Sequence, residues 1–288
     1  MKTYLDCFAC LLRQSLEAAR FSGADEKGQK QVMMAALEIL SNTDPASTPP
    51  QITSKIHQSV REITGNIDPY QEIKEKSTQE ALTYYPRIKQ LVLESEDPLT
   101  TAVKMSIAGN IIDYGLPDQI KLAEIIEQAV DQPLAINHMA ELKTRLQKIP
   151  WLLYVADNAG ETVFDRVLIE LLNPLPVKYA VKGGASLNDA TRKDALEAGI
   201  GEIAEIVDTG YPAPGIIPEY SSSEFLLLLE NAPLVIAKGQ GNYESLSEYG
   251  ERFFFLLQAK CDVLARDVGV PVKSWIVKQG ESKTQITH

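Results

Sequence analysis

Apolar residues in the first half of the chain recur three and four positions apart, which is the spacing of amphipathic helices. One stretch places them at Leu5, Phe8, Leu12 and Leu16, and a second at Val32, Ala35, Ala36, Ile39 and Leu40. Polar turns interrupt the pattern near residues 21–25, 42–50, 65–69 and 96–98. Further helices are predicted over 100–112, 117–130 and 139–148. The first half is therefore predicted to be a helical bundle or cap.

From Pro150 onward the pattern changes to short apolar runs bounded by Pro and Gly, alternating with helical stretches. This is typical of βα units that build a parallel sheet. Strands are predicted at 151–156, 177–181, 203–207, 234–237, 263–265 and 275–277, and helices at 162–172, 190–198, 223–231 and 243–249. The chain is thus predicted to be an α/β protein, with a helical N-terminal domain over 1–148 and an α/β domain over 149–288.

Length and charge narrow the function classes. A chain of 288 residues is long enough for two domains. It carries 28 Lys and Arg against 39 Asp and Glu, a formal charge of −11, and no basic run, so no nucleic-acid partner is expected.

No apolar run reaches membrane-spanning length and no signal-peptide core is present, which favours a cytoplasmic protein without a membrane partner. Three cysteines are too few for a disulfide scaffold. The oligomeric state stays open.

Polar side chains follow three of the predicted strands. Asp157 and Asn158 come directly after the first strand, Asn188 and Asp189 after the second, and Lys238 after the fourth. The carboxyl ends of parallel strands meet at one edge of a sheet, where ligands bind. Oxygen ligands suit a hard cation such as Mg²⁺ or Mn²⁺. The pattern therefore predicts a metal and phosphate site at this edge.

Each of these residues also has a plainer interpretation. Either Asx pair could cap the helix that follows it, because Asn and Asp are common helix caps. Lys238 could be a solvated loop residue, and Gly160 and Gly239 simple turn residues. The common edge favours the ligand site, since capping does not require the pairs to coincide there. The same glycines would let the backbone approach a bound phosphate.

At these positions the sequence resembles the metal-dependent damage-control phosphatases, formerly catalogued as a domain of unknown function (DUF89). The matching segments are Ala156-Asp157-Asn158-Ala159-Gly160-Glu161, Leu187-Asn188-Asp189-Ala190-Thr191, Lys238-Gly239-Gln240-Gly241-Asn242-Tyr243-Glu244, Ala259-Lys260-Cys261 and, in the helical half, Gly109-Asn110-Ile111-Ile112-Asp113. The opening Cys7-Phe8-Ala9-Cys10 is similar to the archaeal and bacterial branch.

The resemblance implies a helical domain on a three-layer α/β/α Rossmann-like domain, and hydrolysis of small phosphorylated metabolites, including damaged or side-product ones. It implies that Asp157, Asn158 and Asp189 hold a divalent cation, which could be Mg²⁺, Mn²⁺, Co²⁺ or Ni²⁺. Lys238 would then hold the phosphate. Asn110 and Asp113 would close the pocket from the helical side.

For the chemistry, we expect a metal-oriented water to attack phosphorus. Glu161 or Asp113 is the candidate base for that water. Lys238 and backbone N–H groups near Gly160 and Gly239 would neutralise the phosphate. A phospho-aspartyl intermediate on Asp157 is the alternative.

Two other function classes stay open. Cys7 and Cys10 have the spacing of a redox dithiol or half a zinc site, which Cys261 and His57 could complete in space. The Rossmann-like half could host S-adenosylmethionine-dependent carboxyl methyl transfer. The first βα loop, however, lacks the G-x-G-x-x-G pattern of dinucleotide sites.

Overall fold

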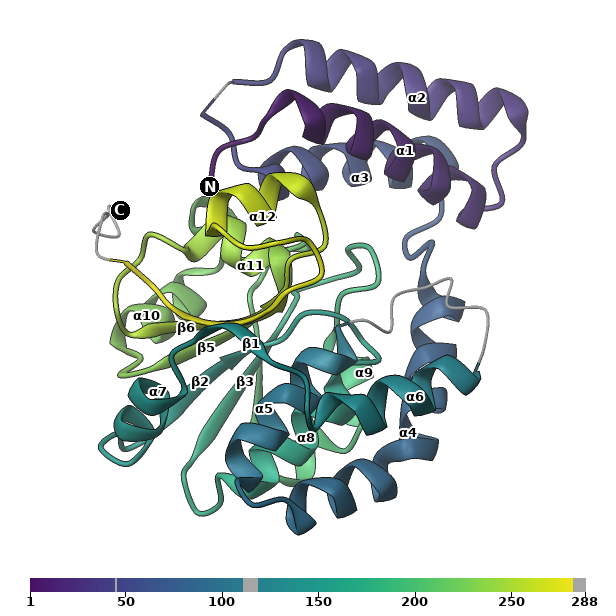
Figure 1. Cartoon of the computed structure of the whole chain (residues 1–288). Helices are drawn as coiled ribbons and strands as arrows, with labels where there is room; N and C mark the ends of the chain where they lie inside the picture. Colours follow the sequence, from purple (N-terminus) through teal and green to yellow (C-terminus); the bar gives the residue numbers. More distant parts are fainter. Residues whose placement is uncertain (45, 111–118, 282–288) are drawn as a thin grey trace.

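Seven strands form one sheet in the order β1-β7-β6-β5-β2-β3-β4, as seen in a computed structural model that describes residues 1–44, 46–110 and 119–281 (Figure 1). The strands are β1 (Leu134–Asn137), β2 (Leu152–Val155), β3 (Val177–Val181), β4 (Glu205–Asp208), β5 (Val235–Lys238), β6 (Phe253–Gln258) and β7 (Trp275–Gln279). All neighbouring pairs are parallel except β6 and β7, which run antiparallel. The predicted α/β class with a mostly parallel sheet is confirmed.

Helices cover both faces of the sheet. The first face packs against α4 (Gln71–Glu94), α5 (Pro98–Gly109), α6 (Gln119–Ala129), α7 (Met139–Leu146), α8 (Thr162–Leu171) and α9 (Arg192–Glu197). The second packs against α10 (Ser223–Asn231), α11 (Gly239–Leu246) and α12 (Asp262–Val268). Two 3₁₀ turns lie at Ile200–Glu202 and Pro218–Tyr220. The result is a three-layer α/β/α arrangement.

Side chains along each strand point alternately to the two faces of the sheet, and this divides the hydrophobic core between the faces. In β2, Leu152 and Tyr154 join the core of the first face, while Leu153 and Val155 join that of the second. Successive side chains of a strand point to opposite faces, so a strand covered on both sides must be apolar throughout. β2 is buried at every position for this reason.

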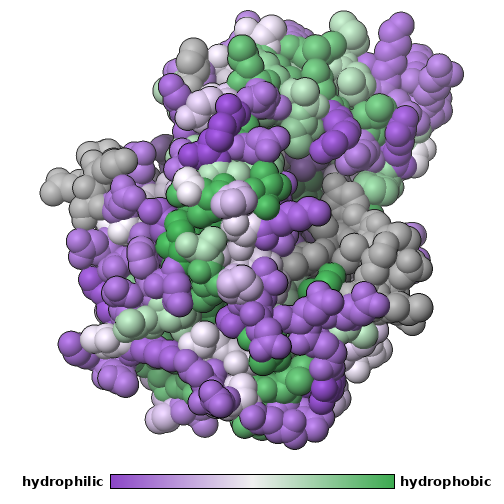
Figure 2. Space-filling model, viewed as in Figure 1, coloured by the Kyte–Doolittle hydropathy of each residue, from purple (hydrophilic) through white to green (hydrophobic). Residues whose placement is uncertain are grey.

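Three N-terminal helices form a separate lobe, which we call the cap: α1 (Leu5–Phe21), α2 (Glu26–Ser41) and α3 (Pro49–Thr64). The cap has small cores of its own and lies over the carboxyl edge of the sheet (Figure 1). Figure 2 shows apolar patches on this upper lobe, where α2 exposes Met34 and Leu37. The cap places its inner helices, α1 and α3, beside the strand ends.

The predicted boundary near residue 148 does not coincide with a break in packing. β1 lies before it, yet pairs with β7 at the edge of the sheet. Helices α4 to α6 share one core with the strands. Within the described residues, the cap is the part that is packed most separately; its first small core is confined to α1–α3, whereas its second also includes Tyr70 and contacts Ile73 and Leu187.

One predicted strand is wrong. Residues 263–265 lie in α12, and the strand of that region is β6. Phe253–Gln258 is an almost uninterrupted apolar run, which shows neither helical nor strand periodicity because both of its faces are buried. Val263, Leu264 and Ala265 are buried on a short helix that packs against the same face.

We expect Phe254→Ala to lower the free energy of unfolding by about 3–5 kcal/mol, because Phe254 is fully buried in the core of the first face. Leu227→Ala on α10 is the control, since Leu227 is 60% exposed and its truncation should change stability by less than about 0.5 kcal/mol. Urea denaturation of both variants measures the difference. Equal stability of the two would contradict this description of the core.

Candidate active site

The order of the strands creates a crevice at the carboxyl ends of β2 and β5. β2 leads to α8 on the first face, whereas its neighbour β5 leads to α11 on the second, so the two connections diverge. Ligands bind at such switch points in open α/β sheets. Asp157 and Asn158 follow β2, and Lys238 is the last residue of β5. The sequence therefore places these three residues at the point where the fold opens.

The loop after β3 is tied to the same place through its backbone. Asn158 and Asp189 form an isolated antiparallel bridge. The N–H of Ala159 donates to the Asn188 carbonyl at 2.9 Å, and the N–H of Ala190 donates to the Asp157 carbonyl at 2.7 Å. The structure thus brings together the two polar pairs that the sequence placed on separate strands.

Neither pair caps the helix that follows it. Helix α8 begins after Glu161 without a side-chain cap. Helix α9 is capped by Thr191, which forms a capping box with Asp194. This arrangement excludes the interpretation of Asp157, Asn158, Asn188 and Asp189 as helix caps.

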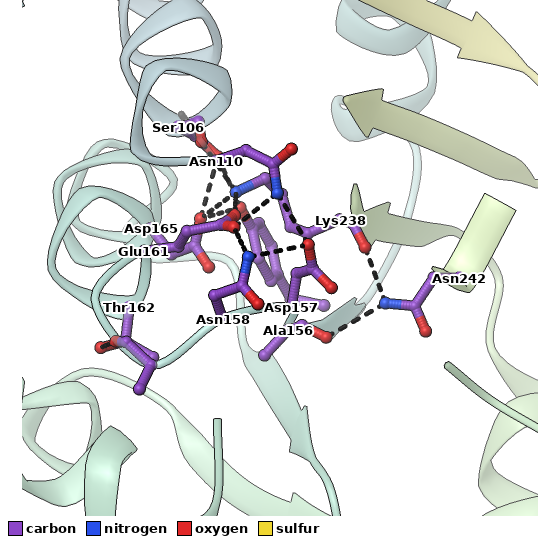
Figure 3. A network of polar contacts seen from close by, with 12 residues as sticks. Ser106, Asn110, Ala156, Asp157, Asn158, Glu161, Thr162, Asp165, Lys238 and Asn242 are labelled. Atoms are coloured by element: carbon purple, nitrogen blue, oxygen red, sulfur yellow. Dashed lines mark hydrogen bonds and ion pairs between the residues drawn. The ribbon is translucent and has the colours of Figure 1, made fainter. Parts of the chain in front are cut away.

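Two asparagine amides hold two carboxylates together at this site (Figure 3). Asn110 at the end of α5 donates to Asp157 Oδ2 at 2.7 Å and to Glu161 Oε1 at 2.5 Å. Asn158 donates to the same two oxygens at 3.3 Å and 2.6 Å. Both side-chain NH₂ groups are spent on carboxylates, so the amide oxygens remain as acceptors or ligands. Oδ1 of Asn110 is buried and has no hydrogen bond.

Lys238 lies beneath these groups and is completely buried. Its Nζ donates to Glu161 Oε2 at 3.0 Å, to Asp165 Oδ1 at 2.8 Å and to the Ser106 carbonyl at 2.8 Å. Burial alone would lower the pKa of Lys238, but the two carboxylates raise it above its ordinary range. All three ammonium protons are engaged, which is at odds with the prediction that Lys238 holds the phosphate. It is also not a solvated loop residue.

Asp165 anchors this lysine and was missed by the sequence reasoning. It accepts hydrogen bonds from Ser106 Oγ at 2.9 Å, Tyr154 OH at 2.7 Å and Tyr179 OH at 2.8 Å, besides that of Lys238. A carboxylate in the first turn of an otherwise apolar helix was the available signal, since such a group is rarely buried without partners. We refer to Asn110, Asn158, Glu161, Asp165 and Lys238 as the buried network.

Glu161 is likewise enclosed, with no exposed surface. Both of its oxygens accept hydrogen bonds, from Asn110 and Asn158 on one side and Lys238 on the other. Its predicted role as the base that contacts a water is therefore at odds with its position. The other candidate base, Asp113, lies outside the described residues.

Asp189 faces a second buried lysine. Lys182 Nζ lies 3.5 Å from Asp189 Oδ2 and 3.3 Å from both the Ala156 carbonyl and Asn242 Oδ1. Asp189 Oδ2 is buried without a hydrogen bond. Sequence reasoning did not single out Lys182, although it directly follows β3 at the same edge of the sheet.

Burial raises the pKa values of all three acids at the strand ends. The pKa of Asp157 rises to about 6, to which the nearby negative charge of Asp189 also contributes. The pKa values of Glu161 and Asp189 both rise to about 7, mainly through burial. Ionising these buried acids therefore costs free energy, and a cation bound beside them would offset that cost.

The two glycines predicted to approach a ligand instead pack against protein atoms. Gly239 has φ +78°, and a Cβ there would lie 1.8 Å from Asp157 Oδ2. A Cβ on Gly160 would lie 3.0 Å from Ser77 Cβ. Gly239 thus allows the start of α11 to lie directly against Asp157.

A cavity of about 550 Å³ lies between the cap and this edge. Its walls comprise Asp6, Cys7, Cys10, Leu11, Arg13, Gln14, Pro49, Pro50, Thr53, Asp157, Asn158, Leu187, Asn188, Asp189, Pro214, Gln240, Gly241, Glu244, Lys260, Cys261, Asp262 and Val263. Of the predicted site residues, Asp157, Asn158, Asn188 and Asp189 line it. Asn110, Gly160, Glu161, Lys238 and Gly239 lie behind the wall.

Lys260 is the lysine that lines the cavity, and it lies two residues after the end of β6. Its positive charge lowers the pKa values of Asp157 and Glu161, which places it near both. Sequence reasoning quoted Lys260 in a motif without giving it a role. Its position after a strand would have been the signal, but β6 was not among the predicted strands.

The donor set fits a hard divalent cation. Asp157 and Asp189 supply carboxylates and Asn158 an amide oxygen, all facing one cavity. In residues 1–44, 46–110 and 119–281, no group of three or more His, Cys, Asp or Glu side chains could hold a metal. A cation here must therefore include the Asn158 oxygen or solvent among its ligands. Asp157, Glu161, Asp165 and Asp189 face two buried lysines, which leaves negative charge for a cation to balance.

Cys7 and Cys10 line the cavity from the cap, and Cys261 lines it from the segment after β6, all as free thiols. The pKa of Cys7 is raised by burial, so this group is held as a thiol. The described residues contain no cysteine-based metal cluster, and His57 is buried with its pKa lowered to about 3. The zinc interpretation of the cysteine pair gains no support.

Comparison with known proteins identifies the family. The model of the damage-control phosphatase ARMT1-like domain matches residues 3–276. The chain belongs to this damage-control phosphatase family. A damage-control phosphatase of Pyrococcus horikoshii is 32% identical over 292 residues, covering 98% of this chain and all of that protein. One from Archaeoglobus fulgidus is 35% identical over 282 residues, covering 94% and 97%.

One further relative, and a solved structure of the Pyrococcus horikoshii protein named above, add to this comparison. An uncharacterised protein of Methanocaldococcus jannaschii is 36% identical over 279 residues, covering 93% of this chain and 92% of that protein. The crystal structure of a DUF89 family protein from Pyrococcus horikoshii superimposes with a TM-score of 0.91 at 31% identity, covering 98% of this chain and all of the other. No helix among the described residues is long and apolar enough to cross a membrane.

The raised pKa of Asp189 predicts a pH-dependent stability difference in metal-free protein. The folded state holds a proton on Asp189 up to about pH 7, whereas the unfolded chain releases it near pH 4. Asp189 therefore costs stability increasingly as pH rises between these values. We expect Asp189→Asn, which does not ionise, to gain stability relative to the parent chain from pH 4.5 to 7.5.

Urea denaturation in chelator at each pH measures this difference. Comparing variant with parent removes the opposite contribution of His57, whose folded pKa is lowered to about 3. A difference that stays constant, or that falls with pH, would contradict the environment described for Asp189.

Proposed function

We propose that this member of the damage-control phosphatase family hydrolyses phosphate monoesters of small metabolites with a divalent cation. The observation that carries the proposal is the meeting of Asp157, Asn158 and Asp189 at the switch point of the sheet, inside one cavity. A volume of about 550 Å³ is within the range of small-molecule sites. Relatives named damage-control phosphatases over nearly the full chain support the same reaction class.

Asp157, Asn158 and Asp189 would hold the cation. When bound, a divalent cation supplies charge neutralisation to a phosphate oxygen and acidifies a water. The chain's own contribution is to keep the two carboxylates and the amide in one arrangement. The buried network does so, because Asn158 is fixed by Glu161, and Glu161 in turn by Lys238.

Lys260 takes the phosphate-neutralising role that the sequence had suggested for Lys238. It lines the cavity, whereas Lys238 is enclosed behind it. A lysine offers a compact point charge, which suits the oxygens of a transferring phosphoryl group. Asn188 and Gly241 lie on the same wall and can contribute polar contacts.

The competing chemistries find less support. No observation favours methyl transfer over the reaction class of the named relatives. A phospho-aspartyl route through Asp157 would be expected to use a second Asp two positions later, where this chain has Ala159. We therefore favour attack by a water.

Chelation should abolish hydrolysis of phosphate monoesters, and a divalent cation should restore it. The test is a screen of a phosphate-ester panel with Mg²⁺, Mn²⁺, Co²⁺ or Ni²⁺ in turn after treatment with a chelator. The same cations should raise the thermal unfolding temperature, because they bind only the folded carboxylates. Full activity after exhaustive chelation would exclude the proposed metal role.

Asp157→Asn and Asp189→Asn should each lower kcat by at least about a hundredfold and remove the thermal shift with Mn²⁺, because each loses a charged ligand. Asp208→Asn is the matched control. Asp208 also ends a strand of the sheet, but it is exposed and does not line the cavity. Wild-type turnover in either ligand variant would remove that residue from the site.

A further inference from the structure

Hydrolysis of an alkyl phosphate leaves an alkoxide, which departs readily only if a proton reaches its oxygen. The proposed function assigns no group to this task. Three carboxylic acids line the cavity besides Asp157 and Asp189, namely Asp6, Glu244 and Asp262. Asp6 and Asp262 are exposed, whereas Glu244 is only 6% exposed. Glu244 is therefore the enclosed acid on the wall that is not a proposed metal ligand.

Helix α11 carries Glu244 past the metal-binding residues. The helix begins at Gly239, whose backbone lies directly against Asp157. Gln240 follows directly, and Glu244 lies one turn further along the helix. Because these two residues are four positions apart, they share a helix face. Gln240, Gly241 and Glu244 all line the cavity. The close approach at Gly239 thus sets this acid on the wall beside the strand ends.

The carboxyl group of Glu244 is held in one orientation. Gln240 Nε2 donates to Glu244 Oε1 at 2.7 Å, which orients the carboxyl group, while the ammonium group of Met1 holds the backbone by donating to the main-chain carbonyl oxygen of Glu244 at 2.8 Å. Because Oε1 is an acceptor in this contact, a proton on the carboxyl group must sit on Oε2. Burial, and to a lesser degree the charge of Asp157, raise the pKa of Glu244 to about 7 against the lowering effects of Gln240 and the Met1 ammonium group, so about half of the Glu244 side chains carry the proton at pH 7.

We propose that Glu244 is the general acid that protonates the leaving-group oxygen of the substrate. As the water oxygen bonds to phosphorus, the bond from phosphorus to the ester oxygen breaks and its electron pair goes to that oxygen. The oxygen takes the proton from Glu244 Oε2 and leaves as an alcohol. The water loses its own proton to solvent, and solvent then reprotonates Glu244. This role rests on the proposed phosphatase function.

Such an acid matters only when the leaving group is a poor one. Glu244→Gln keeps the shape and the contact with Gln240 but cannot supply the proton. On glycerol phosphate with Mn²⁺, we expect kcat/KM to fall by roughly 10²- to 10⁴-fold, the usual contribution of general acid catalysis. On p-nitrophenyl phosphate, whose leaving group departs as a stable anion, we expect less than about a threefold change.

Glu248→Gln is the matched control, since Glu248 lies one turn beyond Glu244, is exposed and does not line the cavity. It should leave both substrates unaffected. Thermal unfolding with and without Mn²⁺ should show that Glu244→Gln folds and binds the cation like the parent. An equal loss on both substrates would make Glu244 a structural residue and overturn the proposal.

An undiminished rate on glycerol phosphate would likewise overturn it. Failure of the proposed phosphatase function is distinguished from failure of the Glu244 role by the activity of the parent chain. In that case the parent chain hydrolyses neither ester with any of the four cations, and the role of Glu244 falls with it. Hydrolysis of both esters by the parent, with equal sensitivity to Glu244→Gln, would instead reject Glu244 alone.

Discussion

The ammonium group of Lys238, enclosed between the carboxylates of Glu161 and Asp165, is the interaction on which the site depends. Two anions and one cation in a water-free interior are costly unless every hydrogen bond is made. Here Ser106, Tyr154 and Tyr179 complete the shell of Asp165, and two asparagine amides complete that of Glu161. Removing one charge would leave the others uncompensated, at a cost of about 3–5 kcal/mol.

This network links three separate elements and the loop after β2 to one point. Lys238 comes from β5, Glu161 and Asp165 from the start of α8, and Asn110 from the end of α5. Of the network residues, only Asn158, Glu161 and Asp165 lie near one another in sequence. The network therefore converts the topology of the sheet into a fixed orientation of Asn158, whose amide oxygen is then left for a ligand. Precision at the cavity wall is set by residues behind it.

The sequence predicted the fold class and the meeting of the strand ends, because both follow from periodicity and from the geometry of parallel sheets. Asp157, Asn158, Asn188 and Asp189 were found in this way. What it could not predict was depth. Lys238 and Lys260 both follow strands, and no local pattern distinguishes the enclosed lysine from the one that lines the cavity. Because β6 was not predicted as a strand, nothing in the sequence pattern indicated that Lys260 lies at the same carboxyl edge of the sheet.

The cap contributes to the cavity in two short stretches, residues 6–14 of α1 and residues 49–53 of α3, while the opposite wall comes from the segments that follow five strands, β2 to β6. The second small core of the cap also includes Tyr70 and contacts Leu187, so the cap is packed against the loop after β3 there. On the proposed function, residues 6–14 and 49–53 would decide which phosphate ester fits the cavity, whereas the reacting groups would come from the strand ends. Substitutions in these two stretches would then change substrate preference while the reacting groups stay the same.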